Sequence, residues 1–423
     1  MRPILFDIPN KTRSRFYPLA LSRPIWELRC GITDLEEKLR ARLDLGQPSY
    51  FVPGYMERDF RERSGGPVNE PSALVGDDLL LLNPKIKAEE LDIESIGVEE
   101  VGIDEDNEVL YARIPKDRFA DSNPTSIQEL LELARKELPT AESSIPRWEF
   151  IWDLVEANGK HIEADFERLG RSGIEGRVEP PNTIRGEAST VYVAPGAQIH
   201  PMVVIDAESG PVYIDEEAVI QPFSRIEGPC YIGKKTIVLG AKCREGNSIG
   251  PDCRIGGEVE ESIVQGYSNK YHDGFLGHAY VGEWVNLGAL TTNSDLKNDY
   301  SSVRVPLEGG RHFDTGSTKI GCFIGDHTKT SIGTLLNTGT HIGAMCLLLT
   351  EGKLMPKYLP SFTWYLHGEP SLGFGKNRLY EAAEKAMARR GVKWTDTQIR
   401  MWDIIFELTS TDRNRLLPKA STT

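Results

Sequence analysis

Aliphatic residues recur every six positions through the middle of the chain. Val193, Ile199 and Ile205 are six apart, and the same step runs through Ile214, Ile220, Ile226, Ile232 and Val238. A period of six is neither the 3.6 of a helix nor the alternation of an open sheet. It is typical of a parallel β-helix, in which each hexapeptide forms one short strand and a turn. We therefore predict a β-helix over residues 184–355.

The flanking segments lack this repeat. Residues 1–183 are predicted to form a mixed α/β domain that ends in a Pro-rich linker at 178–183, and residues 356–423 a helical tail. In the first domain we expect a strand at 2–7 and a buried strand within 72–83, interrupted by Gly76-Asp77-Asp78. Helices are expected at 31–43, 127–138 (capped by Ser126), 147–159 (closed by Asn158-Gly159), 377–390 and 395–410 (capped by Thr395).

Composition limits the class of protein. The net charge is −14, with 26% charged and 39% hydrophobic residues. Such a charge argues against a general nucleic-acid or anionic-membrane surface. No run of residues approaches a membrane span, and the apolar run near Met1 is too short for a secretory signal. The six cysteines include no C-x-x-C pair, so we expect reduced thiols and a cytoplasmic protein without structural zinc on cysteine.

The repeat is broken between 266 and 282 by "GYSNKYHDGFLGHAYVG". This stretch, with the phrases "GEWVNLGA" (282–289) and "GDHTK" (325–329), resembles the bifunctional UDP-N-acetylglucosamine diphosphorylase / glucosamine-1-phosphate N-acetyltransferase family. The similarity is greatest to a variant branch that carries a sugar-nucleotidyltransferase-like N-terminal domain. The resemblance covers essentially the whole chain and is strongest through 230–350. It implies a left-handed parallel β-helix and a transferase of sugar-nucleotide biosynthesis.

The resemblance also assigns roles in acetyl transfer from acetyl-CoA. It makes His272 the base, which suits an imidazole with an ordinary pKa near 6.5. The expected contacts to an amino-sugar 1-phosphate are Lys242, Glu258, Asn286, Asn293 and Lys297, and Lys329 is expected to meet a CoA phosphate. Lys242 stands where the family has an arginine, Glu260 where it has a phosphate-binding lysine, and Phe275 where it has a tyrosine. A carboxylate at 260 would repel a sugar phosphate.

The N-terminal domain departs further from a nucleotidyltransferase. A glycine-rich loop normally cradles the nucleotide phosphates, but here no glycine occurs before Gly31. Arg13, Arg15 and Arg23 are candidates to bind the triphosphate instead. Asp77 lies in a Gly-Asp-Asp sequence that resembles the element holding catalytic Mg²⁺, and an ordinary turn explains those residues equally well.

Two other functions fit the same sequence. A hydratase of the carbonic-anhydrase type would bind zinc between subunits through His272, His278 and either His327 or His341. A non-catalytic scaffold would bind a sugar nucleotide without turnover. Because β-helix acyltransferases build their sites between subunits, we expect a homotrimer.

Overall fold

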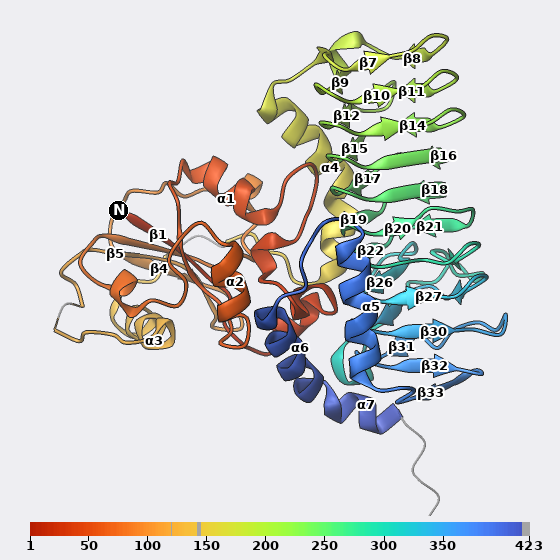
Figure 1. Ribbon diagram of the computed structural model, residues 1–423. Helices are drawn as coiled ribbons and strands as arrows, with labels where there is room; N and C mark the ends of the chain where they lie inside the picture. Colours follow the sequence, from red (N-terminus) through yellow and green to blue (C-terminus); the bar gives the residue numbers. More distant parts are fainter. Residues whose placement is uncertain (120, 142–144, 417–423) are drawn as a thin grey trace, which may run out of the picture.

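The computed structural model describes residues 1–119, 121–141 and 145–416 of the 423-residue chain. An α/β domain lies beside a tall parallel β-solenoid, and the C-terminal helices lie between the two (Figure 1). All six cysteines are buried and free. Within the described segments, no helix is long and apolar enough to cross a bilayer.

The N-terminal domain is built on a five-stranded mixed sheet of order β2-β1-β3-β5-β4. Its strands are β1 (Arg2–Phe6), β2 (Ser49–Phe51), β3 (Leu79–Leu82), β4 (Glu100–Ile103) and β5 (Val109–Ile114). β1 is parallel to β2 and β3, whereas β5 is antiparallel to β3 and β4. The carboxyl ends of β1 and β3 therefore meet at one edge, together with the start of β5.

Helices cover both faces of this sheet. Leu80 and Leu82 of β3 pack in one core cluster with α1 (Leu35–Leu43) and α2 (Glu57–Arg63), and Leu79 and Leu81 pack in another with α3 (Ile127–Glu137). The four consecutive leucines therefore form a strand buried on both faces. The side chain of Ser126 caps α3 as predicted, accepting a hydrogen bond from the Glu129 N–H at 3.2 Å.

The solenoid has three faces, and each face takes one strand from each coil. Face 1 contains β6 (Gly173–Ile174), β9 (Val191–Val193), β12 (Val212–Ile214), β15 (Cys230–Ile232), β17 (Asn247–Ile249), β19 (Ile263–Gly266), β22 (Tyr280–Glu283), β26 (Cys322–Ile324), β29 (Thr340–Ile342) and β31 (Tyr358–Leu359).

Two long strands turn a corner and belong to both remaining faces. They are β16 (Ile237–Cys243) and β18 (Arg254–Glu260). Face 2 otherwise contains β7 (Arg177–Val178), β10 (Gln198–Ile199), β13 (Val219–Ile220), β20 (Asn269–Lys270), β27 (Lys329–Thr330), β30 (Leu347–Leu349) and β32 (Trp364–Leu366). Face 3 contains β8 (Thr183–Arg185), β11 (Val204–Asp206), β14 (Arg225–Glu227), β21 (Phe275–Gly277), β23 (Thr292–Asn293) and β28 (Leu335–Leu336).

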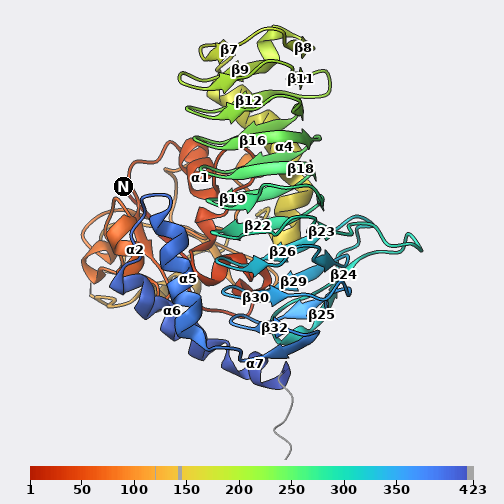
Figure 2. The ribbon, with the colours of Figure 1, turned by 45° about the vertical axis from the view of Figure 1, so that its right-hand side comes forward.

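The six-residue period is confirmed as the inward position of this solenoid. Ile214, Ile220 and Ile226 occupy faces 1, 2 and 3 in turn, and Ile232 stacks on Ile214 one coil later. All four are fully buried in one core cluster. After β23 the chain leaves the solenoid and forms a hairpin of β24 (Arg304–Pro306) and β25 (His312–Asp314) beside the C-terminal coils (Figure 2).

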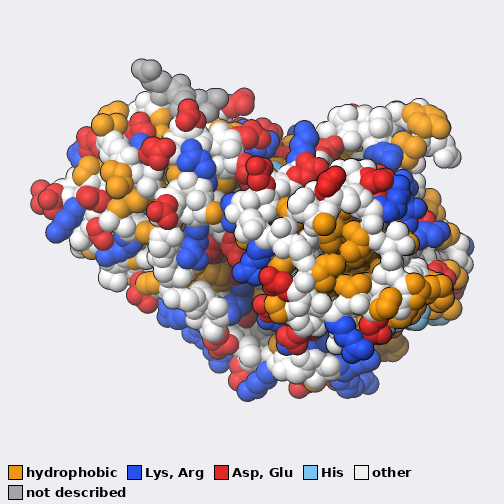
Figure 3. All heavy atoms as spheres, turned by 90° about the horizontal axis from the view of Figure 1, so that it is seen from above, with side chains coloured by type: hydrophobic (Ala, Val, Ile, Leu, Met, Phe, Trp, Pro, Cys, Tyr) orange, Lys and Arg blue, Asp and Glu red, His pale blue; other side chains and the backbone are white. Residues whose placement is uncertain are grey.

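The solenoid is longer than predicted at both ends. The expected linker at 178–183 lies in the first coil, because β7 pairs with β10 and β8 pairs with β11. At the other end β31 and β32 continue the ladders past residue 355, and β33 (Glu369–Ser371) closes face 2 antiparallel to β32. Among the described residues, no further strand is stacked on β6, β7 and β8 of the first coil. Ile174 and Ile184 are 50% and 37% exposed, and Figure 3 shows hydrophobic side chains gathered there.

The helix expected at 147–159 does not end at Asn158-Gly159. It is α4 (Ile151–Leu169), which ends at Gly170 with a φ of 62°. Asn158 is fully buried where α4 lies along face 1, and its amide donates to the Gly246 carbonyl at 2.8 Å and accepts from the Gly31 N–H at 2.7 Å. Asn158 therefore does not end the helix. It connects α4 to two segments that are distant in sequence, at Gly31 and Gly246.

The C-terminal tail packs against both bodies. It contains α5 (Lys376–Ala388), α6 (Asp396–Leu408), which is capped by Thr395 as predicted, and α7 (Ser410–Leu416), which was not predicted. Tyr380 and Trp402 share one core cluster with Leu80 of the sheet and with Phe362 of the solenoid. The three segments of the chain therefore share one apolar core.

Candidate functional site

Three residues of the expected acceptor site lie in one ladder on face 3. Lys242 of β16 pairs with Glu258 of β18, and Glu258 pairs with Phe275 of β21. In-register parallel strands lie about 4.8 Å apart, and neighbouring side chains on a strand point to opposite faces. The next residues on these strands are buried: Cys243, Val259 and Leu276. Lys242, Glu258 and Phe275 therefore form one outward-facing strip.

His272 lies beside this strip at the corner between faces 2 and 3. It is exposed, in the turn that joins β20 to β21. Lys270 is buried below the turn, and its ammonium donates to the carbonyls of Gly256 at 3.0 Å and His272 at 2.6 Å. Burial lowers the pKa of Lys270 to about 8. The interruption of the repeat thus places one histidine at the surface and fixes its backbone from below.

Glu260, the expected source of repulsion, is already paired. Its side chain is 7% exposed, accepts a hydrogen bond from Arg244 at 2.8 Å and lies 3.6 Å from the ammonium of Lys319. Two cations therefore offset its charge. Arg244 also lies 3.9 Å from Glu258 and 4.0 Å from Glu245, so the cluster as a whole carries no net positive charge. The pairing of Glu260 reduces the repulsion that its carboxylate would exert on a sugar phosphate.

Two other predicted acceptor residues make local contacts. The amide of Asn293 is buried, accepts from the Gly277 N–H at 2.9 Å and donates to the Gly277 carbonyl at 2.9 Å. It joins neighbouring coils. Lys297 lies after β23 and donates to the Ser302 carbonyl at 2.9 Å, which holds its own turn. Neither side chain is brought to His272 by a contact within the described chain.

A histidine–aspartate pair lies close to the same strip. His278 Nδ1 is 2.8 Å from Asp295 Oδ2, and His278 Nε2 is 3.6 Å from Glu261. Burial would raise the pKa of Asp295, but the hydrogen bond and charge of His278 hold it below its ordinary value. From the sequence, His278 is considered only as a candidate zinc ligand and is not paired with Asp295. The pairing follows from the loop geometry of adjacent coils and not from their spacing.

Asn286 and Lys329 lie on face 2, on the other side of the His272 corner. Asn286 bridges Asn269 and Lys329 in one parallel ladder. Together with α5 they line a cavity of about 390 Å³. The Lys329 ammonium is half-buried and donates only to backbone carbonyls, those of Trp284 at 3.2 Å and His327 at 3.4 Å. The structure therefore brings together one predicted acceptor contact and the predicted CoA contact.

The other histidines of the zinc alternative are buried. His327 lies among the rings of Trp284, Trp394 and Trp402, and His341 packs on Tyr358. Burial lowers the pKa of His327 well below its ordinary value and that of His341 to about 3. Among the side chains that the structure describes, no three His, Cys, Asp or Glu form a group able to hold a metal within one chain.

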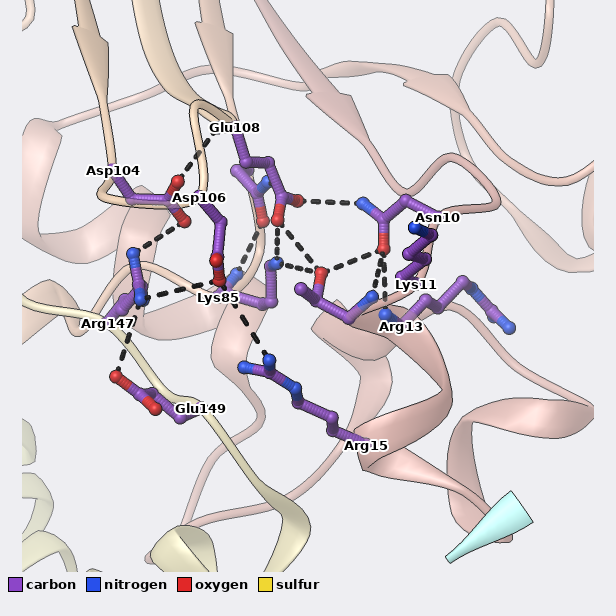
Figure 4. A network of polar contacts seen from close by, with 12 residues as sticks. Asn10, Lys11, Arg13, Arg15, Lys85, Asp104, Asp106, Glu108, Arg147 and Glu149 are labelled. Carbon is purple, nitrogen blue, oxygen red and sulfur yellow. Dashed lines mark hydrogen bonds and ion pairs between the residues drawn. The ribbon is translucent and has the colours of Figure 1, made fainter. Parts of the chain in front are cut away.

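The N-terminal domain has its own cavity, of about 560 Å³, at the edge where β1 ends. The loop after β1 forms one wall, and Asn10 organises it: the Asn10 Oδ1 accepts from the N–H groups of Thr12 at 3.0 Å and Arg13 at 2.8 Å (Figure 4). Backbone N–H groups at this position are what a glycine-rich loop offers to phosphate. Here a side-chain carbonyl already occupies two of them.

The three arginines expected to bind a triphosphate lie in different surroundings. Arg15 lines the cavity, with its guanidinium 3.9 Å from Asp106. Arg13 is buried and bonded to Asp7 at 2.8 Å, so it stabilises the loop from inside. Arg23 is buried at the interface between domains, paired with Glu283 at 3.1 Å and with Asp326. In this arrangement only Arg15 faces the nucleotide-sized space.

Asp77 does not fit the expected magnesium site. It precedes β3, and because β1 and β3 are parallel it lies at the opposite edge of the sheet from the loop after β1. Its carboxylate is 41% exposed and 3.6 Å from the N-terminal ammonium. A single exposed carboxylate beside a cation is a poor Mg²⁺ site. The prediction that Asp77 and Arg15 act on one nucleotide is therefore corrected.

The edge next to the cavity holds a lysine instead. Lys85, after β3, donates to Glu108 at 2.5 Å and to Thr12 at 2.7 Å (Figure 4). Although burial would raise the pKa of Glu108, the charge of Lys85 and hydrogen bonds from Lys85, Thr12 and Asn83 hold it below its ordinary value. Lys85 does not itself line the cavity, but it holds two residues that do, Thr12 and Glu108.

Comparison with known proteins agrees with these two halves. Residues 3–172 match the family model described as "Sugar nucleotidyl transferase". The predicted family resemblance is confirmed. A bifunctional sugar-1-phosphate nucleotidylyltransferase/acetyltransferase of Sulfurisphaera tokodaii is 35% identical over 147 residues, covering 32% of this chain and 34% of that protein.

A bifunctional protein GlmU of Cupriavidus pinatubonensis is 28% identical over 229 residues, covering 48% of this chain and 46% of that protein. The chain thus spans a third to a half of these relatives' length. A solved Francisella novicida UDP-N-acetylglucosamine acyltransferase is 12% identical, with a TM-score of 0.23, over 56% of this chain and 86% of that chain.

Proposed function

We propose that this chain is a transferase of sugar-nucleotide biosynthesis whose solenoid transfers an acetyl group from acetyl-CoA to an amino-sugar 1-phosphate. The observation that carries the proposal is the register that lines up Lys242, Glu258 and Phe275 beside the exposed His272. In the bifunctional family this constellation is the acceptor side of an acetyltransferase. The relatives named above support the same pathway class.

In this reaction the amine nitrogen attacks the thioester carbonyl, the carbon–sulfur bond breaks and CoA leaves as the thiolate. His272 would accept the proton that the attacking nitrogen releases. Lys242 would hold the sugar phosphate as a point charge, since it lacks the two-pronged geometry of an arginine. Glu258 would accept a hydrogen bond from the amino sugar. Because His272 is exposed at a corner, a neighbouring subunit of a homotrimer would complete the site.

The N-terminal domain is proposed to bind a nucleotide or sugar phosphate in the cavity next to Lys11 and Arg15. Its membership of the nucleotidyl transferase family supports this. Since Asp77 does not fit as a magnesium ligand, no step through that residue and a metal is proposed. A non-catalytic, ligand-sensing N-terminal domain remains the second candidate, and the occupied N–H groups of Thr12 and Arg13 favour it.

The test is CoA release from acetyl-CoA with glucosamine 1-phosphate and other amino-sugar 1-phosphates. We expect His272→Gln to reduce the rate about 10²- to 10⁴-fold with an unchanged melting temperature, because the side chain is exposed. His367→Gln is the matched control, since His367 is 90% exposed and remote from the strip. An unchanged rate in His272→Gln would remove that residue from the mechanism, and stoichiometric zinc would favour the hydratase.

A further inference from the structure

The cavity between face 2 and α5 concentrates positive charge in an acidic protein. Four of its lining residues are cations, and none of its lining residues is a carboxylate; the cations are Lys329, Lys385, Arg389 and Arg390. The whole chain carries a net charge of −14. A local excess of this size, opposite in sign to the protein, requires a physical reason.

The helix dipole explains part of this cluster of cations but not all of it. Lys385, Arg389 and Arg390 lie at the C-terminal end of α5, where the helix dipole favours cations. Lys329 belongs to the solenoid, on the opposite wall, and Arg254 is a solenoid residue near Arg390 that does not line the cavity. Arg254 donates to the carbonyls of Lys235 and Cys253, and its pKa is lowered by burial and by the charge of Arg390. Two separate elements therefore bring cations together at a cost in repulsion.

These cations are not neutralised by the protein. Elsewhere on α5 the basic residues are paired, Lys376 with Asp403 at 2.6 Å and Arg378 with Glu381 at 2.7 Å. Throughout the described residues, the four cavity cations have no carboxylate within 4.0 Å, and Arg390 bonds only to the amide oxygen of Asn269 at 2.9 Å. Burial lowers the pKa of Lys329 to about 8, as expected where an ammonium lacks a counter-charge.

The other residues that line the cavity could pack against an aromatic ring of a ligand, and they leave space for it. The ring of Tyr267 is half-buried and stacks on Trp284, with centroids 4.4 Å apart and planes at 15°. Ala382 and Ala386, one turn apart on α5, are the small residues that leave the space open. The volume of about 390 Å³ lies in the range of small-molecule sites.

We propose that this cavity, the α5 groove, binds the diphosphate and base of a nucleoside diphosphate moiety. Four unpaired cations are more than enough to offset the negative charge of a diphosphate, and charge-assisted bonds from Arg and Lys recognise its oxygens. The aromatic pair offers a surface for the base. Such a moiety occurs both in CoA and in free nucleotides or nucleotide sugars. The proposal does not depend on acetyl transfer, because binding is measured directly.

The test is isothermal titration of the full chain with acetyl-CoA, ADP and UDP at two salt concentrations. We expect at least one probe to bind, and the double variant Lys385→Gln/Arg389→Gln to weaken it tenfold or more. Both side chains are exposed at the rim, so the fold should be retained. Arg378→Gln is the matched control, because it removes a cation of α5 that does not line the groove.

The pattern of binding identifies the source of the ligand. Binding of acetyl-CoA that is lost in the double variant makes the groove the donor site. Binding of UDP or ADP without acetyl-CoA makes it a site for free nucleotide. Either outcome supports the proposal provided that Lys329→Gln also weakens binding. If no probe binds at millimolar concentration, or if both the double variant and Lys329→Gln bind as tightly as wild type, the proposal is overturned.

Discussion

Lys85 and Glu108 form an ion pair 2.5 Å long at the edge of the N-terminal sheet where the first loop turns. The ammonium also holds Thr12, so one lysine connects the end of β3, the start of β5 and the loop after β1. Its side chain is 5% exposed and that of Glu108 is 16% exposed. A loop without glycine thus obtains its shape from side chains.

Lys85→Met is therefore expected to lower the free energy of unfolding by about 2 kcal/mol, because it leaves a mostly buried carboxylate without its cation. Urea denaturation at pH 7 measures this. Lys11→Met, which removes an exposed charge from the same loop, should stay within about 0.5 kcal/mol of wild type. As pH falls through the lowered pKa of Glu108 the wild type loses this stabilisation, so the difference between the two proteins should shrink in acid.

Arg23→Met tests the connection between the domains. Arg23 is buried between Glu283 and Asp326, and its loss leaves the buried Asp326 without a cation. We expect Arg23→Met to lower the free energy of unfolding by about 3 kcal/mol. In calorimetry we expect one unfolding transition for the wild type and two for the variant. Arg63→Met is the control, since Arg63 pairs with Asp59 in the same region but is 39% exposed. Equal effects of the two variants would contradict a special role for Arg23.

Lys270→Met should change how stability depends on pH. In the folded protein Lys270 loses its proton near pH 8, whereas an unfolded lysine does so near about 10.4. Between these values the unfolded state binds more protons, so the free energy of unfolding gains up to about 1.4 kcal/mol per pH unit from this residue. The wild type should therefore gain stability relative to Lys270→Met from pH 8 to 10. Parallel curves from chemical denaturation would refute the assignment.

Asp77→Asn and Arg15→Gln test which end of the N-terminal sheet binds a nucleotide. Only Arg15 lines the cavity, so Arg15→Gln should weaken binding of UTP about tenfold, while Asp77→Asn leaves it unchanged. Arg13→Gln should instead reduce stability, because its buried partner Asp7 would lose its cation. Titration calorimetry and thermal unfolding distinguish these effects. A loss of UTP binding in Asp77→Asn would restore that residue to the nucleotide site.

Sequence reasoning found what short-range patterns encode. The hexapeptide period identified the solenoid because every inward aliphatic, such as Ile220 or Ile226, is buried by the same local geometry. Asn158 was wrongly predicted to end a helix, because an Asn-Gly pair is typical of helix ends. In the structure the helix continues, and the Asn158 amide bonds to Gly31 and Gly246 instead. Asp77 was misplaced because the sequence alone does not show on which side of Gly76-Asp77-Asp78 the strand lies.

The candidate site was recovered only in part for a related reason. Lys242, Glu258 and Phe275 are spaced by one coil each, so a family pattern can find them. Asn286 and Lys329 are 43 positions apart because the hairpin excursion intervenes, and the register of coils brings them together. The arginines at the end of α5 reach the same groove only through docking of the tail, which no local pattern encodes.

The first coil, on which no further described strand is stacked, leaves the solenoid with two unlike ends. At the C-terminal end of the solenoid, β33 and the terminal helices pack against the last coils. At the N-terminal end, Ile174 and Ile184 are exposed to solvent on the surface that, in every other coil, packs against the next coil. The exposed strand edges and aliphatic side chains of the first coil could pair with one more coil of the solenoid. A further coil added at this end would therefore lengthen the solenoid without changing the geometry of the acceptor strip or the α5 groove, because each coil contacts only its neighbours.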